Sequence, residues 1–197
     1  MLNRRRPLSE VCTKGPQNGF YRKGSEINGD IAIIKMKQLF GCTAVGEAED
    51  CDYVKLTENE LNRFLLTEDD LVFGRRSLVI EGAGKCRRVG TLAKAMTFES
   101  SLLRITLDSK IVRPRYLQYW FDSDEGLKSM ATIRSVTTIA GIKGSDLAKI
   151  MVPVPPISLQ DDFLRILKQL DKSKFELEQA LSELTLTYKR ILAENLG

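Results

Sequence analysis

The sequence predicts an α+β fold, in which a globular, mainly antiparallel β domain with short helices precedes one long C-terminal coiled-coil helix. Short apolar runs separated by turn signals continue to about residue 156, a pattern typical of antiparallel sheets or open barrels. Pro153, Pro155 and Pro156 then prevent a helix from passing through them. Beyond them apolar residues recur every seven positions, as in a coiled coil. We therefore expect two domains, 1–156 and 157–197.

The strands of the first domain are expected where apolar runs of strand length lie between turn residues. These runs cover residues 30–39, 52–56, 70–75, 77–82, 101–108 and 149–154. Because they are short and closely spaced, they favour a twisted sheet in which most neighbours are antiparallel.

Two short helices are expected between the last two of these strands, at residues 113–123 and 123–132. Pro114 suits the first turn of a helix, and Ser123 suits the N-cap of the second one. Large apolar residues follow at helical spacing, namely Tyr116, Leu117, Trp120 and Phe121. They could form a platform for stacking bases, but a helix that packs into the core explains this spacing better.

The segment after the prolines is predicted as a single helix to the chain end, roughly 60 Å long at 1.5 Å per residue. An apolar row that recurs every seventh residue, with a second row beside it, gives this helix a wide apolar stripe. Such a helix needs a partner. The residues expected to serve dimerisation or partner docking are Phe163, Ile166, Leu170, Leu177, Leu181, Leu184, Tyr188 and Ile191.

Most catalytic and metal-binding arrangements are excluded by composition. The 197 residues include no histidine, which removes Ser-His, Cys-His and two-His-carboxylate sites. The four cysteines form no C-x-x-C pair, so free thiols are expected rather than a zinc site. The Gly-Lys at residues 84–85 lacks the other P-loop residues, because Val79 and Cys86 occupy their positions. We expect no catalytic residue, metal or cofactor in this chain.

Location and charge narrow the function classes further. No apolar run reaches membrane-spanning length and the N-terminus lacks the pattern of a signal peptide, so a cytoplasmic protein is expected. The formal net charge is +4, and residues 158–197 carry six Lys/Arg against seven Asp/Glu, so the excess lies in the first domain. This excess indicates a polyanionic partner such as nucleic acid.

Candidate DNA contacts follow from the basic clusters of the first domain, which we expect in turns. These residues are Arg75, Arg76, Lys85, Arg87, Arg88 and Lys143. The polar turn before the Pro-rich strand adds weaker candidates, Ser135, Thr137 and Thr138.

The segment "TTIAGIKGSDLAKIMVPVPPISLQDDFLRILKQLD" (137–171) resembles a junction found in specificity (S) subunits of type I restriction-modification systems. It is similar to the end of a target-recognition domain and the start of the conserved helix that follows. The matching positions are Thr138, Gly141, Asp146, Leu147, Ile150, Val152, Pro153, Pro155, Pro156, Gln160, Leu167, Leu170 and Asp171. Residues 66–77 and 113–126 resemble further family elements, whereas Asp69 and Leu159 depart from the pattern.

The resemblance implies a subunit that recognises DNA without chemistry of its own. In that family the helices dock an adenine methyltransferase, which uses S-adenosylmethionine, and the subunit directs it and a restriction (translocase) subunit to a bipartite site. A complete S subunit resembles two recognition domains and two helices, and this chain has one of each. It is therefore either a half-length form, expected to pair as an antiparallel homodimer on palindromic double-stranded DNA, or a fragment of a longer subunit. The alternative is a non-DNA scaffold that acts through its coiled-coil helix.

Overall fold

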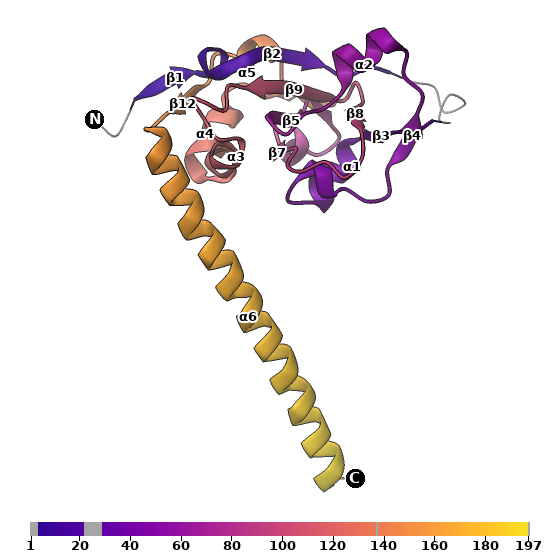
Figure 1. The fold of residues 1–197 in the computed structure, drawn as a ribbon, viewed down its shortest axis with the longest axis vertical. Helices are drawn as coiled ribbons and strands as arrows, with labels where there is room; N and C mark the ends of the chain where they lie inside the picture. Colours follow the sequence, from indigo (N-terminus) through magenta and orange to yellow (C-terminus); the bar gives the residue numbers. More distant parts are fainter. Residues whose placement is uncertain (1–3, 22–28, 137, 197) are drawn as a thin grey trace. The chain divides into compact units, whose positions relative to one another are not determined.

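The computed structural model describes residues 4–21, 29–136 and 138–196, and divides the chain into two units, Met1–Ile157 and Ser158–Gly197 (Figure 1). Strands and short helices make up the first unit, and the single helix α6 (Ile157–Leu196) makes up the second. The predicted α+β class and the long C-terminal helix are therefore confirmed.

The centre of the first unit is a four-stranded antiparallel sheet. Its order is β2 (Cys12–Asn18), β9 (Leu102–Leu107), β5 (Asp70–Gly74), β7 (Cys86–Arg88). Every residue of β5 and β9 is buried, because successive side chains point to opposite faces and both faces are covered. Leu71 and Phe73 lie in one apolar cluster, and Val72 lies in a second one on the opposite face.

A second sheet has three strands in the order β4 (Asp52–Val54), β3 (Ile31–Ile34), β8 (Met96–Phe98). The β3 strand is antiparallel to β4 but parallel to β8, the one departure from the antiparallel pattern among the named strands. Two helices belong to this part of the chain, α1 (Met36–Gly41) and α2 (Glu58–Phe64). The Thr57 side chain caps α2 by accepting a hydrogen bond from the Glu60 N–H.

Two predicted strands are wrong in part. The strand expected over residues 30–39 ends at Ile34, because the chain turns at Lys35 into α1, where the Gln38 side chain accepts a hydrogen bond from the Lys35 N–H. The strand expected over residues 77–82 is replaced by the two-residue strand β6 (Arg76–Ser77) and the 3-10 turn η4 (Ile80–Gly82).

The helices predicted at residues 113–123 and 123–132 are confirmed as α3 (Pro114–Asp122) and α4 (Asp124–Ala131). Ser123 caps α4, with its hydroxyl oxygen accepting a hydrogen bond from the Gly126 N–H. Leu117, Trp120 and Phe121 are buried in the same apolar cluster as Leu71 and Phe73 of β5. The interpretation of these residues as core rather than as a stacking platform is confirmed.

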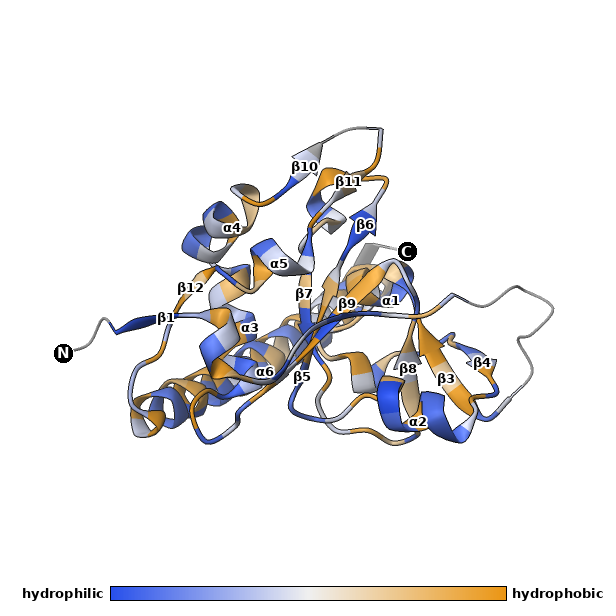
Figure 2. Ribbon diagram, turned by 90° about the horizontal axis from the view of Figure 1, so that it is seen from above, coloured by the Kyte–Doolittle hydropathy of each residue, from blue (hydrophilic) through white to orange (hydrophobic). Residues whose placement is uncertain are grey.

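The remaining strands form two small sheets. One contains β10 (Ser135–Val136), β11 (Ala140–Gly141) and β6, which lie side by side in Figure 2. The other pairs β1 (Arg5–Pro7) with β12 (Met151–Pro153), so the start of the first unit is hydrogen-bonded to its last strand. The one-turn helix α5 (Gly144–Leu147) and two further 3-10 turns, η1 (Leu8–Val11) and η3 (Val45–Glu47), complete the described elements.

The helix α6 exposes its apolar residues. All eight residues predicted for dimerisation or docking have exposed side chains, including Leu177 at 70% and Leu184 at 67%. Within the described residues, none of the helices combines enough length and apolar character to cross a membrane.

Candidate nucleic-acid interface

The sheet of β10, β11 and β6 brings together two of the residues predicted to contact DNA. Its register places Gly141 opposite both Arg76 and Ser135. A Cβ atom at Gly141 would lie 3.9 Å from Ser135 Oγ and 4.0 Å from Arg76 Cγ. The hydroxyl group and the basic side chain therefore flank the same backbone position, although they are far apart in sequence.

The two arginines before and within β6 have different surroundings. Arg75 is half-buried, and its Nη1 donates a hydrogen bond to the Ser100 carbonyl oxygen at 3.1 Å. Burial, followed by the charge of Arg76, lowers the pKa of Arg75. Arg76 is exposed, and its guanidinium group forms no hydrogen bond or ion pair with the residues that the structure describes. Arg76 is thus the better placed of the two to contact a partner.

The second predicted basic cluster lies largely on a strand, so its placement in a turn was wrong for Arg87 and Arg88. Both belong to β7 and pair with Val72 and Leu71 of β5. Arg87 is held by the protein itself: its Nε donates to the Cys42 carbonyl oxygen at 2.9 Å, and its Nη1 is 3.3 Å from both carboxylate oxygens of Asp122. These contacts tie the end of α1 and the end of α3 to the sheet.

The other two members of this cluster are half-buried. The N–H of Arg88 donates to the Gln118 side-chain oxygen at 2.8 Å. The Lys85 ammonium group lies 5.1 Å from the centroid of the Phe40 ring, a favourable cation–π arrangement. Burial, followed by the charge of Arg87, lowers the pKa of Lys85.

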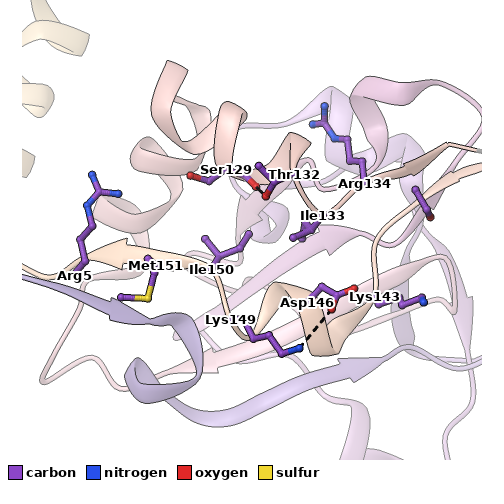
Figure 3. Close-up of a pocket in the computed structure, with 11 residues that line it drawn as sticks. Arg5, Ser129, Thr132, Ile133, Arg134, Lys143, Asp146, Lys149, Ile150 and Met151 are labelled. Carbon is purple, nitrogen blue, oxygen red and sulfur yellow. Dashed lines mark hydrogen bonds and ion pairs between the residues drawn. The ribbon is translucent and has the colours of Figure 1, made fainter.

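A pocket of about 590 Å³ lies beside β10 and collects basic side chains from several elements (Figure 3). Two of the predicted residues line it. Ser135 belongs to β10, and Lys143 directly precedes α5. Three further cations line it, namely Arg5, Arg134 and Lys149. The lining thus contains four cations and one carboxylate, that of Asp146, and an anionic ligand would be favoured.

Partners within the protein engage most of these cations. Lys149 Nζ is 3.9 Å from Asp146 Oδ1, Arg134 Nε donates to the Ala83 carbonyl oxygen at 2.7 Å, and Arg5 is paired with Glu125. Lys143 is exposed and forms no hydrogen bond or ion pair through its side chain with the described part of the chain. Lys143 is therefore the pocket cation most available to a ligand.

The two threonines complete the predicted set. Thr138 is exposed in the bend between β10 and β11, next to the sheet that carries Ser135 and Arg76. Thr137 lies outside the described residues.

The cysteines do not form a reactive or metal-binding site in the described part of the chain. All four are free, and Cys86 is buried. Burial raises the pKa of each thiol, that of Cys12 to about 12. Within the same residues, no cluster of histidine, cysteine, aspartate or glutamate side chains could hold a metal ion.

Comparison with known families decides what this fold is. Residues 4–185 match the sequence model of the family described as "Type I restriction modification DNA specificity domain". The chain belongs to this family. The predicted membership of the specificity subunits is thereby confirmed, and with it the interpretation as a non-catalytic subunit.

Among the relatives of this specificity domain is the type I restriction enzyme EcoKI specificity subunit of Escherichia coli (strain K12). It is 27% identical over 154 residues, which cover 75% of this chain and 33% of that subunit. The chain thus spans about a third of the length of this curated relative.

Solved structures share the fold. A chain from a study of complex assembly and conformational transition of the type I R-M system has a TM-score of 0.67 at 18% identity, covering 95% of this chain and 43% of that one. The HsdS subunit from Thermoanaerobacter tengcongensis has a TM-score of 0.60 at 16% identity, covering 90% and 39%. The S subunit from M. genitalium has a TM-score of 0.57 at 14% identity, covering 86% and 39%.

The residues that sequence reasoning missed are Arg5, Arg134 and Lys149. Lys143 and Lys149 flank the short helix α5, a spacing that could have indicated a shared surface. Arg5 joins them only because β1 pairs with β12, a contact between the two ends of the first unit that no local pattern reveals.

Proposed function

We propose that the first unit recognises a specific sequence in double-stranded DNA, and that the chain directs an adenine methyltransferase and a restriction subunit to a bipartite site. The observation that carries this proposal is the match of residues 4–185 to a DNA specificity family. The cationic pocket and the neighbouring sheet support it, because exposed cations on one surface suit the phosphate groups of a duplex.

Arg76 and Lys143 are proposed to contact phosphates, and Thr138 to donate a hydrogen bond to the sugar-phosphate backbone of the DNA. The Ser135 hydroxyl donates to the Gly141 carbonyl oxygen at 3.2 Å, so Ser135 is proposed to contact the DNA through its acceptor lone pairs. Both cations are exposed and uncommitted to other described residues, which leaves them free to displace counterions from DNA. Arg87 is assigned a different role, because its contacts with Cys42 and Asp122 already use its guanidinium group. We therefore expect its replacement to lower stability more than affinity.

The chain supplies recognition and the partners supply chemistry. Methyl transfer from S-adenosylmethionine is assigned to the methyltransferase subunit, and the exposed apolar stripe of α6 to the protein contacts of the assembly. A second copy of the chain would cover the seam that contains Leu170, Leu177 and Leu184. Leu181 and Tyr188 would then remain for the methyltransferase subunit. Antiparallel pairing of two such helices would give the DNA site inverted symmetry.

Equilibrium binding over a range of salt concentrations tests DNA recognition. Duplexes are first selected from a random pool in the presence of the cognate methyltransferase subunit, and the affinity of the purified protein for them is then measured. Arg76→Ala and Lys143→Ala should each weaken binding and reduce the slope of log affinity against log salt by about one unit. Lys110→Ala is the matched control, because Lys110 is exposed but does not line the pocket.

Two results would contradict the proposal. One is affinity that stays the same in both variants, and the other is association with a protein that is insensitive to salt and occurs without DNA binding. The second result would favour the scaffold alternative, in which the apolar stripe of α6 is the main functional surface.

A further inference from the structure

Three consecutive apolar residues project from the turn that follows β6. The side chains of Leu78, Val79 and Ile80 are 89%, 52% and 45% exposed. Large apolar side chains that are exposed together on a soluble protein usually mark a contact surface. These residues, called the apolar turn below, have no part in the sheet or the core of the first unit.

The exposure of the apolar turn follows from a defined backbone. The Val79 N–H donates a hydrogen bond to Ser77 Oγ at 3.2 Å, and the Gly82 N–H donates to the Val79 carbonyl oxygen at 3.1 Å. Gly82 packs so closely on the Ser77 side chain that a Cβ atom would collide with it. The turn is therefore fixed at both ends, and its side chains are held outward.

A fourth apolar residue extends the surface. The antiparallel register pairs Ala140 of β11 with Ser77 of β6, and Ile139 and Leu78 are the next residues of the chain beyond this last pair. The Ile139 side chain is 46% exposed. The apolar turn and Ile139 thus adjoin the last pair of the sheet that carries Arg76 and Ser135.

The charge around the apolar turn favours DNA over the apolar core of a protein interface. Arg75 and Arg76 precede it, and Lys143 follows β11 two residues after Gly141, while Glu81 is the acidic residue within η4. The buried centre of a protein interface is depleted of charged residues. The major groove of a duplex instead presents thymine methyl groups between two rows of phosphates, which matches apolar side chains flanked by cations.

We propose that Leu78, Val79 and Ile80 enter the major groove and pack against thymine 5-methyl groups, while Arg76 and Lys143 contact the flanking phosphates. The inference rests on the proposed DNA recognition and adds residues that determine its specificity. The minor groove does not suit this surface, because it presents no methyl group.

Replacement of thymine by deoxyuridine isolates this contact, since it removes the 5-methyl group and keeps the base pair. The selected duplex is synthesised with one such replacement at a time, and its affinity for the wild-type protein is measured. At one or more positions we expect a loss of about 3- to 10-fold, the range for removing one buried methyl group. Leu78→Ala should bind the thymine duplex more weakly and should lose sensitivity at the same positions.

Leu127→Ala is the matched control, because Leu127 is an equally apolar residue of α4 that is 47% exposed and outside this sheet. It should keep the sensitivity of the wild-type protein to deoxyuridine. Leu78 is exposed, so the thermal midpoint of Leu78→Ala should equal that of the wild-type protein, which separates a lost contact from a lost fold.

The two proposals fail in different ways. Salt-dependent DNA binding that is equal for thymine and deoxyuridine at every position overturns the role of the apolar turn and leaves DNA recognition standing. A selected site that contains no thymine would also overturn the role of the apolar turn and leave DNA recognition standing. Loss of methyltransferase co-purification in Leu78→Ala, with unchanged DNA affinity, would identify the turn as a protein contact and also overturn the inference. The absence of any DNA binding overturns both proposals.

Discussion

The central sheet and the helix α6 use the same residue types in opposite ways. In β5 and β9 every side chain is buried, whereas the leucine and isoleucine residues predicted for docking on α6 are exposed. Burial of apolar surface stabilises the first unit without help from another chain. The apolar stripe of α6 can contribute in the same way only when another helix covers it. Leucine and isoleucine thus stabilise the first unit where they are buried, and form an exposed apolar stripe on α6.

The largest expected effect is on the stability of the first unit. Phe73 is fully buried, and its ring lies 5.1 Å from that of Phe121 in an edge-to-face arrangement. Phe73→Ala should lower the free energy of unfolding by about 4 kcal/mol, because it removes buried apolar area and leaves a cavity. Urea denaturation followed by the fluorescence of Trp120, the single tryptophan, measures this unit alone. An equal loss in Leu184→Ala would contradict the contrast between the regions.

The next effect concerns a buried ion pair in the same sheet. Arg104 and Asp70 are buried with Arg104 Nη1 3.6 Å from Asp70 Oδ2, and Arg104 also donates to the Leu65 carbonyl oxygen at 2.9 Å. Arg104→Gln should lower the free energy of unfolding by about 3 kcal/mol, because it leaves a buried carboxylate without its counter-charge. The double variant Arg104→Gln/Asp70→Asn should recover part of the loss in the same denaturation assay.

The loss in Arg104→Gln should also depend on pH. Burial raises the pKa of Asp70, against hydrogen bonds from Thr106 and Thr67 and the charge of Arg104. Without Arg104 the pKa rises further, so the folded protein retains a proton that the unfolded chain has released. Stability then falls as pH rises from the ordinary aspartate pKa through the raised one. The difference from the wild-type protein should be larger at pH 8 than at pH 5, and a reversed trend would refute this assignment.

A near-zero effect on the first unit is expected from changes in α6. Leu177→Asp combined with Leu184→Asp should leave the Trp120 transition within about 0.5 kcal/mol of the wild-type value, because both side chains are exposed. The same variant should lose self-association in sedimentation experiments, since aspartate in a helix seam opposes pairing. A wild-type protein that sediments as a monomer at micromolar concentration would exclude the homodimer.

The last prediction concerns the cysteines, all of which lie in the first unit. Because burial raises the pKa of each thiol, little thiolate is present at pH 7.5, and a thiol reagent should label the folded protein slowly. Unfolding in guanidinium should expose all four to rapid labelling. Rapid labelling of Cys86 in the folded protein would show that the core opens more readily than its burial indicates.

The sequence pattern correctly predicted the elements that are determined by the spacing and capping of residues close together in the chain. The strands β5 and β9, the helices α3 and α4, and α6 follow from apolar spacing and from the signals of Pro114 and Ser123. The errors fall where one apolar run contains two different structural elements. Residues 30–39 contain a strand and a capped helix, and residues 77–82 contain a fixed turn that exposes Leu78.

The candidate site was less predictable, because the tertiary fold sets the distances between its side chains and the directions in which they point. Sequence charge identified Lys143 and Arg76, but it did not reveal that the guanidinium group of Arg87 is held by Cys42 and Asp122. Nor did it associate Arg5 with the pocket, since that requires the pairing of β1 with β12.

That pairing of β1 with β12 also makes the first unit an exchangeable module. Arg5 lies opposite Pro153 and Pro7 lies opposite Met151, so the polypeptide enters and leaves the unit through adjacent strands. A unit whose two ends lie together can be replaced without rearranging what is attached to it. Residues 8–150 could therefore diverge, or be exchanged for those of a relative, while the two strands keep the same junction to the helix. The fold thus separates residues 8–150 from the two strands that form the connection.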